Sequence, residues 1–240
     1  MSGPNEDLRR RMALVGETDA VKQLLSRSIA SIGRRGSVEV DPYATLQLLS
    51  QAIERLLKLT IMFQHHRAHG ELAAVRSYGH RVDRLATVVF ETAWGYRDSN
   101  DFRVLDEDLE FAANDPTLQL LLDACAEFSS GGRYHHLDVA AGGMGDPARA
   151  PKVMWDAIEQ SALADDSDLL SRMATLDYRV HEEALQEINL RIIAVAQRYI
   201  RFIARLWAFS PTGDLGRQHS GSLQAWLMLN DDQLRTPCNS

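Results

Sequence analysis

The densest set of chemically capable side chains in this sequence lies between Gly132 and Asp138, where the chain reads Gly-Arg-Tyr-His-His-Leu-Asp. Arg133 offers a guanidinium, Tyr134 a phenol and His136 one of two adjacent imidazoles. A guanidinium binds anions such as phosphate, and an imidazole exchanges protons near neutral pH. The set therefore suits anion binding or acid–base work on a phosphodiester. The alternative is structural: Tyr134 anchors the segment to the helices while the charged groups stay solvated.

A second set of polar side chains precedes this segment and contains Arg76, Tyr78, His80 and Arg84. Residues four apart lie on one face of a helix, so Arg76, His80 and Arg84 form one stripe if the helix is continuous. Gly79 lies within the stretch and would weaken or break such a helix. The alternative interpretation of this stripe is an exposed basic surface.

We expect the two sets to face each other across a groove. The candidate ligand-binding residues are Tyr78, His80, Arg133, Tyr134 and His136. In this arrangement Arg133 holds an anion, and His80 or His136 donates or accepts a proton. The alternative is that Tyr134 and His80 only tie the loop to the helices.

Sites for metals and for nucleotide phosphates have no complete motif here. His181 is followed by a glutamate, but Leu185 stands where a zinc-protease helix needs its second histidine. None of the eight histidines has a glutamate three residues before it, as di-iron bundles require. The run from Gly142 to Gly145 lacks the lysine of a phosphate-binding loop. The sequence therefore predicts no metal and no cofactor.

The overall composition is that of a globular protein. Hydrophobic residues make up 45% of the 240 residues and charged residues 25%. The formal net charge of −7 argues against general binding of polyanions, although a local basic patch can still bind RNA. No segment approaches the roughly 20 apolar residues of a membrane-spanning helix, so we expect a soluble cytoplasmic protein. Cys125 lies on an apolar face and is expected to be a core residue.

Apolar spacing of three and four predicts helices almost throughout. Asp41 and Asp115 each precede a proline, a combination typical of helix starts. A Gly-rich irregular segment is expected at 129–151. The predicted helices cover residues 6–32, 41–69, 71–94, 115–128, 152–164, 167–209 and 222–229.

These elements predict an all-α fold, with residues 1–240 forming a single helical domain. We expect a bundle of about six or seven helices. The long helix at 167–209 should be its centre, covered by the helices at 41–69 and 71–94. Arginines on the later part of the long helix are expected to border a core face or to pair with acids on a neighbouring helix.

A homodimer is expected from apolar positions in excess of what one narrow helix face needs. These positions are Leu57, Ile61, Val88 and Trp226. Surplus apolar surface usually marks an interface between protein chains.

Residues 41–140 resemble the HEPN-like helical proteins of bacteria. The resemblance is carried by the run from Glu54 to Lys58, by Tyr78-Gly79-His80, and by Gly132-Arg133-Tyr134. It implies an α-helical bundle, often dimeric, sometimes with RNase activity or a nucleotide-handling partner.

The sequence departs from this family at the RNase motif. That motif is an arginine followed by a histidine after four to six intervening residues, and no histidine here has an arginine at that distance. Arg76 and His80 have three residues between them, one too few. We therefore expect a non-enzymatic HEPN-like binding protein linked to nucleic acid or phage defence. The alternative is a ribonuclease or nucleotide-acting enzyme that uses Arg/His residues in a groove between the helices and the 129–151 loop.

Overall fold

A computed structural model describes most of the chain, and its regular structure is helical. Every regular element among the described residues is a helix and none is a strand, which confirms the predicted all-α class. The helices are more numerous than the six or seven predicted. The described residues are 4–36, 42–97, 105–143, 146–164, 166–209 and 211–238.

The helices differ widely in length. The longer ones are α1 (Pro4–Gly33), α2 (Tyr43–His69), α3 (Val82–Trp94), α5 (Pro116–Ser130), α7 (Pro151–Leu163) and α9 (Tyr178–Ala208). The shorter ones are α4 (Asp106–Asn114), α6 (His135–Ala140), α8 (Ser167–Met173), α10 (Gly213–His219) and α11 (Gln224–Leu227). Short 3-10 turns are η1 (Val75–Tyr78), η3 (Gly132–Tyr134), η4 (Pro147–Arg149), η5 (Ser220–Leu223) and η6 (Asp231–Gln233).

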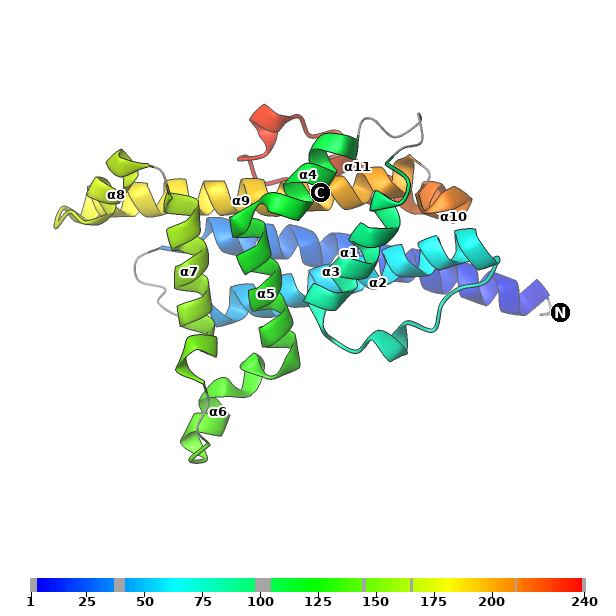
Figure 1. Cartoon of the computed structure of the whole chain (residues 1–240), viewed down its shortest axis with the longest axis horizontal. Helices are drawn as coiled ribbons and strands as arrows, with labels where there is room; N and C mark the ends of the chain where they lie inside the picture. The colour runs from blue at the N-terminus through cyan, green and yellow to red at the C-terminus, as the bar shows by residue number, and fades with distance from the viewer. Residues whose placement is uncertain are drawn as a thin grey trace.

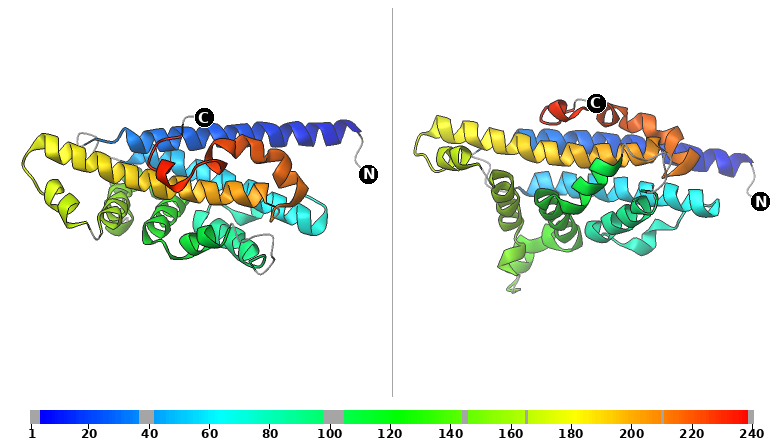
Figure 2. Two further views of the ribbon diagram at one scale, coloured as in Figure 1. Left: turned by 90° about the horizontal axis from the view of Figure 1, so that it is seen from above. Right: turned by 45° about the horizontal axis from the view of Figure 1, so that its top comes forward.

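The long helices form one layer and shorter helices cross it. α1, α2 and α9 run side by side along the length of the molecule, and α3, α5 and α7 cross them (Figure 1). The N-terminal part of α1 projects past the other helices at the end where α10 lies (Figure 2). The short helix α6 lies at the far tip of the second layer (Figure 1).

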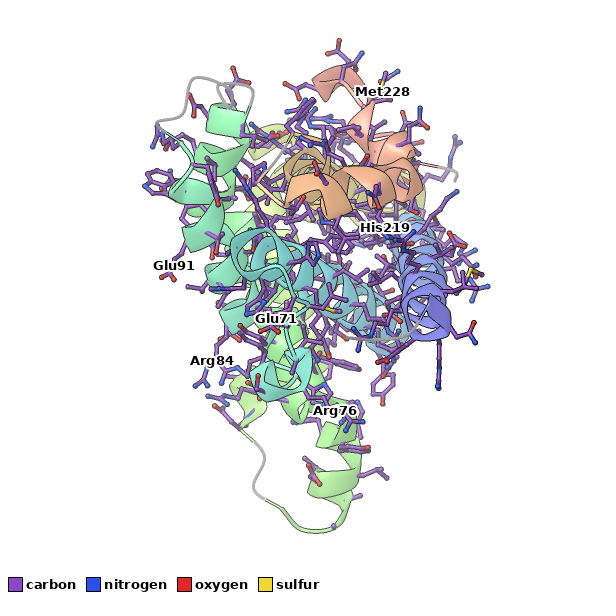
Figure 3. The ribbon with its side chains drawn as sticks, turned by 90° about the vertical axis from the view of Figure 1, so that its right-hand side faces the viewer. Glu71, Arg76, Arg84, Glu91, His219 and Met228 are labelled. Carbon is purple, nitrogen blue, oxygen red and sulfur yellow. The ribbon has the colours of Figure 1, made fainter. Side chains whose placement is uncertain are left out.

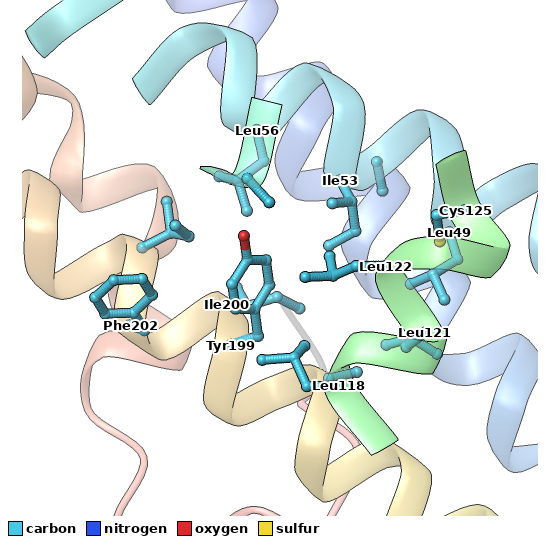
Figure 4. Close-up of a cluster of buried hydrophobic side chains, with 14 of the residues drawn as sticks. Leu49, Ile53, Leu56, Leu118, Leu121, Leu122, Cys125, Tyr199, Ile200 and Phe202 are labelled. Carbon is cyan, nitrogen blue, oxygen red and sulfur yellow. The ribbon is translucent and has the colours of Figure 1, made fainter. Parts of the chain in front are cut away.

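The core forms where α2, α5 and α9 meet. Leu49, Ile53 and Leu56 of α2 point towards apolar side chains of α5 and α9, among them Leu122 and Tyr199 (Figure 4). Cys125 is fully buried in this cluster, as predicted, and burial raises the pKa of its thiol to about 12. The three-four spacing of each helix therefore supplies one face of a shared core.

The predicted single helix at 167–209 is wrong, because the structure divides it into α8 and α9. The Asp177 carboxylate accepts a hydrogen bond from the backbone N–H of Arg179 at 2.9 Å and so begins a new helix. The apolar residue Leu176 lies in the break between the two helices and is fully exposed. The apolar spacing continues across the break, but the Asp177 cap interrupts the series of backbone hydrogen bonds that a continuous helix would have. The expected cover is also different, since α1, α7, α10 and α11 contact α9 more than α2 does.

The predicted helix at 71–94 is likewise interrupted. It becomes the short turn η1 and the helix α3, separated at Gly79, whose φ of 63° is a left-handed value that favours glycine. Helix α4 was not predicted, and the segment expected to be irregular contains η3, α6 and η4.

The two predicted helix starts differ in outcome. The Asp115 carboxylate accepts a hydrogen bond from the N–H of Leu118 at 2.8 Å and caps α5, as predicted. Asp41 lies outside the described residues, and Pro42 precedes α2.

The apolar residues that suggested a dimer belong to the core of one chain. Leu57, Ile61 and Trp226 are buried, and Val88 packs half-buried against the same core. Several helices pack against α2 on more than one face. A buried helix of this kind carries more apolar residues than a helix that buries a single narrow face.

The arginines of α9 pair with acids on other elements, as predicted. The Arg205 guanidinium lies 2.6 Å from the buried carboxylate of Asp108 in α4, and Arg201 lies 3.4 Å from it. Arg191 pairs with Asp166, which precedes α8. These ion pairs attach α4 and α8 to α9.

Candidate functional site

His80 is held by a carboxylate of α2. Its Nδ1 donates a hydrogen bond to Oε1 of Glu54 at 3.0 Å, and Nζ of Lys58 reaches the same oxygen at 2.7 Å. The His80 side chain is 62% exposed, whereas Glu54 is 15% exposed. The spacing of four on α2 brings Glu54 and Lys58 to one face. The arrangement leaves Nε2 of His80 facing away from its carboxylate partner.

The stripe predicted from Arg76, His80 and Arg84 does not form. Arg76 lies on η1 and Arg84 on α3, and the left-handed Gly79 between them ends the helical spacing. Tyr78 packs half-buried against the core. Only His80 of this stripe makes an ion pair among the described residues.

The segment of Arg133, Tyr134 and His136 is attached elsewhere. The Tyr43 hydroxyl donates a hydrogen bond to the backbone carbonyl of Arg133 at 2.7 Å. The Arg133 guanidinium lies over the Tyr134 ring, 5.1 Å from its centroid. The exposed His136 ring meets the neighbouring His135 ring edge-on.

The two predicted sets are therefore anchored at different places on α2. Tyr43 holds the carbonyl of Arg133 and Glu54 holds His80. These two anchors are eleven residues apart, which is about 16 Å along a helix axis. No hydrogen bond, ion pair or ring contact among the described residues joins His80 to Arg133, Tyr134 or His136.

A concave site lies at the C-terminal end of α2. We call it the end groove. It has a volume of about 1150 Å³ and lies between the N-terminal half of α1, the end of α2 and the α10–η5 segment. The residues that line it are Arg10, Arg11, Leu14, Val15, Thr18, His66, Gly70, Glu71, Leu72, Asp214, Leu215, Gln218, His219 and Ser222. Figure 3 looks onto this end and labels Glu71 and His219.

The end groove contains cationic and imidazole groups that have no partner among the described residues. Arg10 is paired with Glu6 at 2.6 Å, and Asp214 is paired with Arg217. Arg11 makes no ion pair or hydrogen bond within the described part of the chain, and neither does the half-buried His66 side chain. These groups are therefore open to a ligand.

His219 forms an uncharged wall of the end groove. Its ring stacks on Phe63 with centroids 5.5 Å apart and an interplanar angle of 15°. Burial lowers the pKa of His219 below its ordinary value of 6.5, so the imidazole is neutral at pH 7. A neutral imidazole offers one hydrogen-bond donor and one acceptor. His219 can thus orient a polar ligand without adding charge.

Close packing holds α10 in position beneath this wall. A Cβ atom at Gly216 would lie 1.8 Å from Oγ1 of Thr212, so only glycine fits there. The Thr212 hydroxyl donates a hydrogen bond to the carbonyl of Leu206 in α9 at 2.9 Å. The end of α9 therefore sets the position of His219.

The residues of the end groove were visible in the sequence, but the sequence did not show that they lie close together in space. Three arginines at 9–11 and three histidines at 65, 66 and 69 are visible clusters. His219 is more than 150 residues from His66, and no local pattern links the two.

The described residues contain no group of three or more His, Cys, Asp or Glu side chains that could hold a metal ion. Within the same ranges, no helix combines the length and apolar character needed to span a bilayer.

Comparison of the chain with protein-family models, with curated proteins and with solved structures finds no match.

Proposed function

We propose that this protein is a non-enzymatic binding protein that holds an anionic ligand with an apolar or aromatic body in the end groove. A nucleotide, or the end of an RNA strand, has this chemistry. The observation that carries the proposal is that Arg11 and His66 line one groove without a partner among the described residues, in a chain whose net charge is −7.

Each group of the end groove is proposed to contact a different part of the ligand. The Arg11 guanidinium presents paired N–H donors that match two phosphate oxygens. His219 hydrogen-bonds a neutral polar group of the ligand, and His66 a phosphate oxygen. Leu72 and Leu215 supply apolar contact for the sugar or the base. The volume suffices for a nucleotide, since small-molecule sites span roughly 300–1000 Å³.

Calorimetric titration with adenosine monophosphate and with a short single-stranded RNA tests this proposal. Arg11→Glu should weaken binding at least about tenfold, because a hydrogen bond to a charged group contributes about 1.5–3 kcal/mol. Arg27→Glu is the matched control, because Arg27 is exposed on the same helix far from the groove. Absence of binding to the wild type, or equal losses in the two variants, would contradict the proposal.

A ribonuclease is the second candidate function, and one contact favours it. The Glu54 carboxylate orients His80 and leaves Nε2 open, an arrangement suited to a general base. Cleavage of a fluorogenic RNA that His80→Ala abolishes, and His69→Ala leaves intact, would support this function. RNA binding without cleavage would favour the binding protein.

We place a homodimer within the same proposal, on a different surface from the one first predicted. Leu8, Met12 and Val15 of α1 are 60%, 62% and 44% exposed and are spaced by four and three residues. This spacing forms the narrow seam of a helix pair. Val15 also lines the end groove, so a second copy on this seam would border the ligand site.

Light scattering distinguishes the dimer from the 26.9 kDa monomer. Met12→Glu should yield the monomer, whereas Leu170→Glu, at an exposed apolar position on α8, should not change the mass. A wild-type mass of 26.9 kDa at tens of micromolar would refute the dimer.

The HEPN-like assignment and the cytoplasmic location also belong to this proposal. Both rest on the sequence, the first on the motifs within residues 41–140.

A further inference from the structure

A second, smaller pocket lies in the crossing layer, away from the end groove. It has a volume of about 380 Å³ and is enclosed by the start of α3, by α5 and by the η4–α7 segment. The residues that line it are Arg81, Asp83, Leu120, Asp123, Ala124, Ala126, Glu127, Ala148, Arg149, Val153, Met154 and Ala157.

Both cations of this crossing-layer pocket are already neutralised. Nε of Arg81 donates to Oδ1 of Asp83 at 2.9 Å, and a second nitrogen of Arg81 donates to Oδ2. Nη1 of Arg149 lies 3.2 Å from Oε2 of Glu127. An incoming anion would have to displace a carboxylate from each guanidinium.

Asp123 is the carboxylate that remains. It makes no hydrogen bond or ion pair among the described residues, whereas Asp83 and Glu127 each have an arginine. Partial burial and the nearby charge of Asp83 raise the pKa of Asp123 above its ordinary value, and the Arg81 guanidinium offsets this rise only in part. A further positive charge brought beside Asp123 would favour its ionised form.

The remaining wall of the pocket is apolar. Leu120 and Ala124 of α5 face Val153, Met154 and Ala157 of α7 across the cavity. Val153 is exposed although it is a large apolar side chain. A ligand with a hydrocarbon body would cover this surface and remove it from water.

We propose that the crossing-layer pocket binds a small organic cation, with its ammonium group on Asp123 and its apolar body on Val153 and Met154. The lining has three carboxylates, Asp83, Asp123 and Glu127, against two guanidiniums, so its net negative charge disfavours an anion. The site is independent of the end groove, because none of its lining residues belongs to that groove.

Three probes with the same hydrocarbon chain and different head groups test this proposal. Hexylammonium, hexanol and hexanoate are titrated into the full chain, and backbone amide shifts of Ala124 and Val153 are followed by NMR. Hexylammonium should bind at least about fivefold more tightly than hexanol, since a charged hydrogen bond replaces a neutral one. Hexanoate should not shift these amides.

Two variants make the outcome specific to Asp123. Asp123→Asn should weaken hexylammonium binding about fivefold or more, because it removes the negative charge from the pocket without changing the shape of the side chain. Asp19→Asn makes the same change of net charge at an exposed position on α1 and should leave binding intact. Equal binding of hexanol, binding of hexanoate, no shift with hexylammonium, or equal effects of the two variants would each overturn the proposal.

Discussion

Asp108 shows how a single residue connects distant parts of this molecule. Its buried carboxylate faces Arg198, Arg201 and Arg205, which lie on successive turns of α9. Arg201 also reaches Asp231 near the C-terminus, at 2.7 Å. Asp108 is therefore the carboxylate that all three guanidiniums share, and Arg201 adds a second partner in Asp231.

Replacing Asp108 should therefore destabilise the protein strongly. Asp108→Asn removes the buried carboxylate that Arg201 and Arg205 share and leaves Arg201 only the exposed Asp231. Breaking a buried pair costs about 3–5 kcal/mol. Chemical denaturation of the variant measures the loss. Asp168→Asn, an exposed aspartate on α8, should change the free energy of unfolding by less than about 0.5 kcal/mol. A small effect of Asp108→Asn would mean that water reaches the arginines.

At the scale of elements, α9 is the helix that most others contact. It packs against α1, α7, α10 and α11, and its residues Ile192 and Ile193 are fully buried. It begins at Asp177, whose carboxylate accepts hydrogen bonds from two backbone N–H groups of its first turn. The apolar face and the cap are independent contributions and can be removed one at a time.

Emptying the buried face of α9 should cost more than removing its cap. Ile192→Ala should lower the free energy of unfolding by about 2–5 kcal/mol, since it leaves a cavity in the core. A loss below about 0.5 kcal/mol in a denaturant melt would show that Ile192 is exposed.

Removing the cap of α9 should have a smaller and more local effect. Asp177→Ala should cost about 0.5–2 kcal/mol, because two N–H groups lose their acceptor. Hydrogen exchange should accelerate at Arg179 and Val180, while amides near Ile192 stay protected. Uniform acceleration along α9 would contradict a local cap.

At the scale of the whole molecule, the end groove links stability to pH. Burial lowers the pKa of His219 from 6.5, so the unfolded chain binds a proton at this position more readily than the folded chain. Well above pH 6.5 the ring is neutral in both states and the effect vanishes. As the pH falls below that value, protonation favours unfolding.

The wild type should accordingly lose stability faster on acidification than His219→Gln. Urea melts at several pH values from about 7.5 to 5 measure the difference between the two proteins, which should grow as the pH falls. His69→Gln, at an exposed position on α2, serves as control and should follow the wild type. Parallel curves for the wild type and His219→Gln would contradict the burial of this ring.

The sequence by itself determined the helical class and most helix positions. Apolar spacing depends on residues within one or two turns, so it correctly predicted α1, α2, α5 and α7. The same local signal missed the cap at Asp177, because apolar periodicity continues across the break. It also assigned Leu57 and Trp226 to an interface, since spacing alone does not show how many neighbours surround a helix.

The tertiary structure alone decided which charged and polar groups meet. Glu54 and His80 are 26 residues apart, and Asp108 is 97 residues from Arg205. Their contacts depend on how whole helices pack, which no local pattern encodes. For the same physical reason, the sequence showed the cations at 9–11 and at 65–69, but only packing brought Arg11 and His66 into one groove with His219.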